Sequence, residues 1–266
     1  MRTVGIDLSA DRSRTAVSMV EWRDRTATVS PPLLRCTDGE LLDQLSGLGP
    51  GDQAGVDTPF GWPAEFVRAV GAHLGGAAWP GRGQDSEHYR KEYLRYRLTD
   101  RLVRDQLRPL SPPLPAPFDR IGAMVARWAH LEDELNNLGC HVGRAGEGQI
   151  CEVYPKASRY RWNLFNGRRS TDELLTAAPW LLCDTATRRA YENEHAFDAL
   201  VCALTARAAA LGLTVRPGPA ELDAARAEGW IHIPRLESLP LLLSCGADGD
   251  RLPPKTDHDA ASVDYP

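Results

Sequence analysis

The sequence predicts an α/β protein built on a mixed β-sheet, and three observations support this prediction. The 266 residues are 42% hydrophobic and 25% charged, which is typical of a globular protein with a sizeable core and excludes collagen-like, coiled-coil and wholly disordered chains. Three short apolar runs near the start of the chain, joined by turns, indicate an antiparallel meander. Later strand candidates alternate with helical segments, which favours a sheet covered by helices.

The meander is predicted over residues 3–8, 14–22 and 26–35. The first run, TVGIDL, is apolar enough for a central strand and ends in Asp7. The third run contains two prolines, which cannot donate a hydrogen bond to a neighbouring strand, so we expect it at an edge of the sheet.

A short helix and a buried strand follow the meander. Thr37 has N-cap chemistry, and the apolar positions after it predict a helix that ends at the Gly-Pro-Gly of 49–51. The pattern of residues 53–57 predicts a buried strand ending in Asp57, and residues 64–73 predict a helix.

A helical insertion is expected over about residues 80–145, because no strand pattern occurs there. Residues 86–108 and 119–138 each predict one long helix. The proline-rich segment 111–117 predicts the turn between them.

The remaining expected elements are strands at 149–154 and 229–234 and helices at 171–178, 195–211 and 219–228. The helix over 195–211 is apolar almost all round, so we expect it to be buried. Residues 246–266 are polar and show no periodic pattern, which predicts a disordered tail after a single domain over 1–245.

Charge and cysteine content limit the partners and the compartment. The chain has 31 Lys and Arg against 36 Asp and Glu, and the net charge of −5 excludes a generic basic coat for nucleic acid but not a local basic groove. Six cysteines without a C-x-x-C pair argue against a zinc ribbon or a thioredoxin motif. The sequence has no recognisable signal peptide or membrane-spanning stretch, so we expect a cytoplasmic protein without a membrane partner.

Four carboxylates stand where a globular core rarely places them. Asp7 and Asp57 end buried strands, Glu152 lies inside the strand QICEVY, and Asp198 lies near the start of the most apolar helix. Converging buried carboxylates repel one another and become protonated unless a cation lies between them. Mg²⁺ or Mn²⁺, which prefer oxygen ligands, would suit such a group.

Each acid also has an ordinary structural interpretation. Asp57 precedes Thr-Pro and could form a turn, and Asp198 could complement the dipole at a helix start. Glu152 could be an exposed residue of an edge strand. Asp7 is the hardest to explain in this way, because it directly follows the first buried strand.

The motifs GIDLS at 5–9, VDTPFGWP at 56–63, EVYP at 152–155 and HAFDAL at 195–200 resemble the DUF429 family. The resemblance spans roughly residues 1–235, with the motifs in order, and R-x-x-D at 97–100 and EGWI at 228–231 add to it. It implies a nuclease of the ribonuclease H-like fold, a mixed five-stranded sheet flanked by helices, here with a helical insertion.

The opening strand and HAFDAL also resemble the RuvC resolvase group of the same fold. That resemblance implies catalytic, metal-binding roles for Asp7, Asp57 and Asp198, with Glu152 as an additional acid. The acidic net charge and the long insertion differ from compact resolvases and argue against a four-way junction as substrate.

The segment 86–108 contains the best candidate for a phosphate-binding surface. Its arginines recur at helical spacing, at positions Arg90, Arg97, Arg101, Arg104 and Arg108. Arginines beside tyrosines can hold phosphates and stack on bases, so Arg97 and Arg101 are candidate substrate-binding residues. The alternative is a solvated face paired with the acidic residues of the same segment.

His195 and Lys156 are further candidates for binding substrate. His195 lies one helical turn before Asp198 and could contact a carboxylate, a phosphate or a metal, or it could be purely structural. Lys156 follows the strand that ends in EVYP and could neutralise a phosphate or face solvent.

These residues together predict a metal-dependent phosphodiester hydrolase that cleaves nucleic acid, DNA or RNA. Two divalent ions would be held by Asp7, Asp57, Glu152 and Asp198, with Asp7 between them. One alternative is a nucleotide-dependent phosphotransferase of the actin and sugar-kinase type, although no second glycine-rich phosphate loop is found. The other is a non-catalytic binding scaffold with the same fold.

Overall fold

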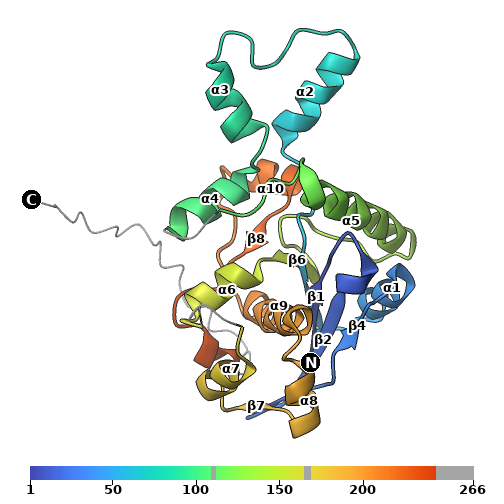
Figure 1. Cartoon of the computed structure of the whole chain (residues 1–266), viewed down its shortest axis with the longest axis vertical. Coiled ribbons are helices and arrows are strands. Elements are labelled where there is room, and N and C mark those ends of the chain that lie inside the picture. Colours follow the sequence, from blue (N-terminus) through green and yellow to red (C-terminus); the bar gives the residue numbers. More distant parts are fainter. Residues whose placement is uncertain (109–111, 165–168, 244–266) are drawn as a thin grey trace, which may run out of the picture.

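The computed structural model describes residues 1–108, 112–164 and 169–243, and within them the strands form a single sheet (Figure 1). The order is β7-β3-β2-β1-β5-β6-β8, and β4 pairs with β2. The strands are β1 (Arg2–Asp7), β2 (Ala16–Trp22), β3 (Ala27–Val29), β4 (Leu33–Leu34), β5 (Gln53–Asp57), β6 (Ile150–Val153), β7 (Leu181–Leu182) and β8 (Ile231–His232).

The sheet is mixed, as the sequence predicts. Strands β1, β2 and β3 are antiparallel neighbours, whereas β1, β5, β6 and β8 run parallel. The expectation of five strands is wrong, because eight are present in the described residues. The third predicted run splits at its prolines into β3 and β4, and the short strands β7 and β8 extend the two edges.

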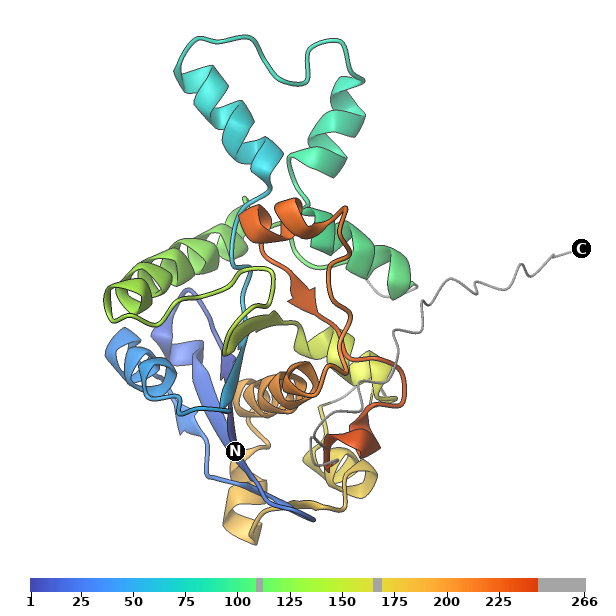
Figure 2. The same ribbon diagram turned by 180° about the vertical axis from the view of Figure 1, so that it is seen from behind.

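Helices cover both faces of the sheet (Figure 2). They are η1 (Arg12–Arg14), α1 (Asp38–Ser46), α2 (Ala64–Leu74), α3 (Ser86–His88), η2 (Tyr89–Tyr93), α4 (Leu98–Gln106), α5 (Asp119–Asn137), α6 (Pro155–Arg161), α7 (Thr171–Ala177), α8 (Thr185–Ala190), α9 (Glu194–Ala210), α10 (Leu222–Glu228) and η3 (Leu239–Leu243). The elements α6, α8 and β7 were not predicted from the sequence, because they are too short to show a clear hydrophobic period.

Successive side chains of β1 point to opposite faces of the sheet and pack into two different cores. Val4 and Ile6 pack with Leu41 of α1 and Trp128 of α5 on one face. Gly5 points to the other face, where α9 crosses the strand, and a Cβ on Gly5 would lie only 1.9 Å from the Ala199 carbonyl oxygen. The apolar helix is therefore buried in backbone contact with the central strand, as predicted, and the odd-numbered residues of β1 face it.

Between β5 and β6 the described residues form helices and connecting loops and no strand. The expected single helix over 86–108 is wrong, because the segment divides into α3, the π-helical turn η2, and α4. The break lies at Arg97, whose backbone is extended (φ −67°, ψ 164°) and serves as the N-cap of α4. Residues on the two sides of this break do not share one helical face.

Helices α2 and α3 project from the rest of the protein as an arm in both views (Figures 1 and 2). The Glu228 carboxylate at the end of α10 fixes both ends of the arm. It accepts hydrogen bonds from the backbone N–H of Ala64 at 2.8 Å and of Leu98 at 2.7 Å, the first residues of α2 and α4. One buried acid therefore satisfies a free backbone donor at the start of each helix.

Two further expectations concern the membrane and the chain end. No helix in the described part of the chain is long and apolar enough to span a membrane. The expected tail over 246–266 lies outside the described residues. The five cysteines within the described residues are free thiols.

Candidate functional site

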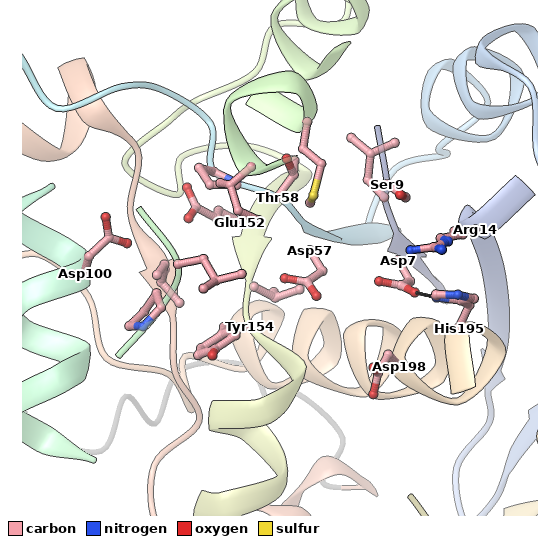
Figure 3. Close-up of a pocket in the computed structure, with 18 of the residues that line it drawn as sticks. Asp7, Ser9, Arg14, Asp57, Thr58, Asp100, Glu152, Tyr154, His195 and Asp198 are labelled. Atoms are coloured by element: carbon pink, nitrogen blue, oxygen red, sulfur yellow. Dashed lines mark hydrogen bonds and ion pairs between the residues drawn. The ribbon is translucent and has the colours of Figure 1, made fainter. Parts of the chain in front are cut away.

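A pocket of about 330 Å³ opens where β1, β5 and β6 end, beside the first turns of α9 (Figure 3). All four predicted acids line it, together with His195. Carboxyl ends of parallel strands are the common position of ligand sites in open α/β sheets. The topology thus brings together residues that are nearly two hundred positions apart in the chain.

Asp7 and Asp57 are partners in the parallel pairing of β1 and β5, and each is the last residue of its strand. Both follow the alternation that directs Gly5 and Gly55 toward α9, so both carboxylates emerge on the α9 face. Figure 3 shows them side by side at the centre of the pocket.

Helix α9 supplies His195 and Asp198 to the same place. Asn193 caps the helix by accepting hydrogen bonds from the backbone N–H of His195 and Ala196, which fixes its first turn. His195 Nδ1 lies 2.7 Å from Asp7 Oδ2. Asp198 is 8% exposed and pairs with Arg169, with 2.6 Å between Nη2 and Oδ2.

Burial and neighbouring carboxylates raise the pKa values of Asp7 and Asp57. Burial, opposed in part by the His195 hydrogen bond and reinforced by the Asp198 charge, raises the pKa of Asp7 to about 6. Burial and the charges of Asp7, Asp198 and Glu152 raise the pKa of Asp57 well above its usual range. A pocket with this excess of negative charge favours a proton or a cation.

The pKa of His195 is raised as well. The hydrogen bond to Asp7, aided by the negative charges of Asp7 and Glu194, raises the pKa of His195 despite partial burial. The imidazole is therefore held at the edge of the carboxylate group in a form that keeps its positive charge to higher pH than a free histidine.

Glu152 also lines the pocket, but it leaves its strand on another face than Asp7 and Asp57, and its role as a catalytic metal ligand stays a prediction. It pairs with Val56 in the register of β5 and β6, so its side chain leaves the sheet on the face opposite Asp7 and Asp57. There it is 2% exposed, and its carboxylate accepts hydrogen bonds from Arg97 and from the Phe60 backbone N–H at 2.9 Å. In this position Glu152 balances the charge of Arg97.

Arg97 is the ion-pair partner of Glu152 and also lines the pocket, and its role in binding substrate stays a prediction. The side chain is 1% exposed, and its five N–H donors all find acceptors: the carboxylates of Asp100 and Glu152 and the Glu228 carbonyl oxygen. Burial lowers the pKa of Arg97, but the two carboxylates outweigh it and raise the pKa overall. Gly229, at φ +93°, allows the close approach, since a Cβ there would lie 2.6 Å from Glu152 Oε2.

Arg101 and Lys156 lie outside the residues that line the pocket. Arg101 donates to the Tyr96 carbonyl oxygen at 2.8 Å and lies over the Tyr93 ring. Arg104 and Arg108 are paired with Glu92 and Asp105, so much of the predicted basic stripe is neutralised within its own segment. The solvated-face interpretation describes this segment better than a phosphate-binding surface does.

Two arginines at the pocket were missed. Arg14 lies in η1, where the turn from β1 to β2 returns beside Asp7 (Figure 3), and its side chain makes no ion pair with the described residues. The sequence feature that could have identified Arg14 is its position in the turn that follows the strand ending in Asp7. Arg169 precedes α7 and reaches Asp198 through the tertiary fold, and no local pattern marks it.

The fit of a divalent cation can be judged from these contacts. Among the described residues, no group of three or more His, Cys, Asp or Glu side chains is arranged to hold a metal ion as it stands. Asp7 is directed to His195 and Asp198 to Arg169, and in Figure 3 the Asp198 carboxylate points away from the other two.

The chemistry of the donors nevertheless suits a hard cation. The Asp57 carboxylate accepts no hydrogen bond within the described residues. Asp198 Oδ1 is buried and has no hydrogen-bond partner there. All three donors are carboxylate oxygens, the ligands that Mg²⁺ prefers. Asp7, Asp57 and Asp198 would hold such an ion once Asp198 exchanges Arg169 for it, since the His195 hydrogen bond occupies only one oxygen of Asp7.

Comparison with known proteins gives one match. The family described as "Protein of unknown function (DUF429)" matches residues 5–222, well over half of the chain. The searches of curated proteins and of solved structures found no match. The matched range includes every acid of the pocket, and the chain belongs to the DUF429 family.

Proposed function

We propose that this protein is a metal-dependent phosphodiester hydrolase that acts on nucleic acid, with Mg²⁺ or Mn²⁺ as cofactor. The observation that carries the proposal is the pair Asp7 and Asp57, adjacent acids at the ends of parallel strands, with Asp198 close enough to raise the pKa of both. A pocket designed only for stability would not gather three acids on one face of a sheet.

The sheet supports the ribonuclease H-like part of the proposal. The central order β3-β2-β1-β5-β6 joins an antiparallel meander to parallel strands, and the first acid lies at the end of the central strand. The last acid comes from the buried helix across that strand. The family resemblance implies the same placement for Asp7, Asp57 and Asp198.

In the proposed reaction the chain's own residues orient water and phosphate. A divalent cation, when bound, supplies Lewis acidity for water activation and for the leaving oxygen. The Asp7 hydrogen bond at Nδ1 orients the His195 ring and leaves Nε2 as the atom that accepts or releases a proton. Arg14 provides positive charge at the pocket for a phosphate oxygen.

The test combines metal binding with cleavage. Wild-type protein should gain thermal stability with millimolar Mn²⁺ and cleave one or more of a set of single-stranded and duplex DNA and RNA substrates. Asp57→Asn should lose both effects, while Asp43→Asn, an exposed acid outside the pocket, should retain both. Cleavage by Asp57→Asn at the wild-type rate would contradict the proposal.

A non-catalytic binding scaffold remains the second candidate, because one observation favours it. Asp7 and Asp198 already have cationic partners in His195 and Arg169, so the protein partly balances its own acids. Absence of both Mn²⁺ stabilisation and cleavage in the wild-type protein would favour the scaffold.

A further inference from the structure

The pocket has an apolar wall in addition to its acids. Five of its lining residues come from the segment before α5 and from α5 itself, or from the loop after β5: Pro59, Pro113, Leu114, Ile121 and Met124. Leu114 is 66% exposed, although it is a large aliphatic side chain. Apolar surface left open inside a pocket, rather than packed in a core, indicates contact with a ligand.

The apolar wall and the charged end of the pocket together suit a ligand that has one apolar face and one charged group. Arg14 and the acid group suit a phosphate, with a cation if one is bound. The aliphatic residues suit a flat apolar face. A nucleotide with an unpaired base has both, because its base face is free for contact, whereas stacking in a duplex covers both faces of each base.

The size of the pocket agrees with one nucleotide. Its volume of about 330 Å³ is at the lower end of the range for small-molecule pockets. Duplex binding, in contrast, uses extended basic surfaces that contact many phosphates. The candidate for such a surface, residues 90–108, has Arg97 buried and Arg104 and Arg108 paired with acids.

Building on the proposed function, we infer that the site takes a single nucleotide with an unpaired base, seated against Leu114, Ile121 and Met124 with its phosphate toward Arg14. The natural source is a single strand or a strand end, and a free nucleotide has the same chemistry. Duplex nucleic acid enters the site only where a base is unpaired.

Equilibrium binding tests the inference separately from cleavage. A fluorescent single-stranded oligonucleotide, a blunt duplex of the same sequence and a nucleoside monophosphate are titrated with the wild-type protein in Ca²⁺ buffer, since Ca²⁺ also prefers oxygen ligands. The single strand should bind about tenfold more tightly than the duplex. Tighter binding of the monophosphate than of the strand would identify a free nucleotide as the source.

Substitutions in the apolar wall test whether the wall itself contributes to binding the single strand. Leu114→Ser should weaken single-strand binding about tenfold, and Met124→Ala should weaken it in the same direction. Leu138→Ser is the matched control, because Leu138 is 59% exposed and lies outside the pocket, and it should bind as the wild type does. Unchanged melting temperatures establish that each variant is folded.

The outcomes separate the two proposals. The inference would be overturned if the duplex bound as tightly as the single strand or more tightly, or if both wall variants kept the wild-type affinity. In either case, cleavage by the wild-type protein would still support the hydrolase proposal. Binding of the monophosphate without binding or cleavage of any polynucleotide would overturn the hydrolase proposal alone. Failure of the wild-type protein to bind the single strand and the monophosphate would overturn the inference.

Discussion

Asp7 and Asp57 end adjacent parallel strands as register partners, and both carboxylates face helix α9. Two acids in this relation repel each other unless a proton or cation intervenes. Burial and neighbouring carboxylates raise both pKa values, that of Asp7 to about 6. The pair provides the most direct tests of the site.

Asp57→Asn should stabilise the metal-free protein above neutral pH. The folded-state pKa of Asp57 is raised above its unfolded value, so ionisation costs stability at high pH and costs nothing below the unfolded pKa, where both states are protonated. The melting temperature should rise by roughly 2–6 °C at pH 8, since 1 kcal/mol corresponds to roughly 2–4 °C in a chain of this size. At pH 3.5 the variant and the wild type should melt together. A lower melting temperature at pH 8 would mean that the carboxylate is held by donors.

The pKa of His195 should depend on Asp7. In the wild type, NMR titration of the His195 imidazole should give a pKa above 6.5, because the hydrogen bond to Asp7 favours the protonated ring. Asp7→Asn removes the charge and should shift that pKa downward. By linkage, the stability that His195 contributes is present below its unfolded pKa and is lost as the pH rises through its folded pKa. An unchanged titration in Asp7→Asn would show that the pair does not form in solution.

Arg97→Met should be strongly destabilising, by about 3–5 kcal/mol, because it leaves the buried carboxylates of Asp100 and Glu152 without their cation. Arg108→Met is the control within the same segment. Its side chain is 76% exposed and its ion pair with Asp105 should contribute less than about 1 kcal/mol. Urea unfolding monitored by circular dichroism measures both. A loss below 1 kcal/mol for Arg97→Met would contradict the buried cluster.

Gly5→Ala should disrupt the contact between β1 and α9. The added Cβ would lie 1.9 Å from the Ala199 carbonyl oxygen and 2.2 Å from the Ala203 nitrogen, so the helix would have to move. We expect a loss of several kcal/mol, about 3 or more, or failure to fold. Gly39→Ala, in α1 with nothing within 4 Å of the new Cβ, should be neutral or slightly stabilising. Comparable stability of the two variants, measured by thermal unfolding, would refute the close packing.

The sequence predicts a site residue only where that residue interrupts a local hydrophobic pattern. Asp7, Asp57 and Asp198 interrupt apolar runs, and that conflict is visible without a structure. Arg14 and Arg169 interrupt nothing, because an arginine in a turn or before a helix is ordinary. Their place in the pocket follows from chain reversals and packing that no local spacing records.

Glu152 shows the limit most clearly. Its sequence pattern is as unusual as that of Asp7, yet it lies on the other face of the sheet. Which face a strand residue occupies depends on register, and a shift of one residue exchanges the two faces. The register of β6 against β5 is a tertiary property, so sequence predicted an unusual acid but not its partner.

The amino-acid sequence by itself determined the strands that end in Asp7 and Asp57, the buried helix that carries Asp198 and the helical nature of the insertion, because hydrophobic periodicity and turn chemistry are local. Tertiary structure alone decided that Arg97 pairs with Glu152 inside the protein and that Arg14 lies at the pocket. A long charged side chain can reach solvent or a buried partner from the same sequence position. The choice depends on the charge and burial of residues that only folding brings beside it.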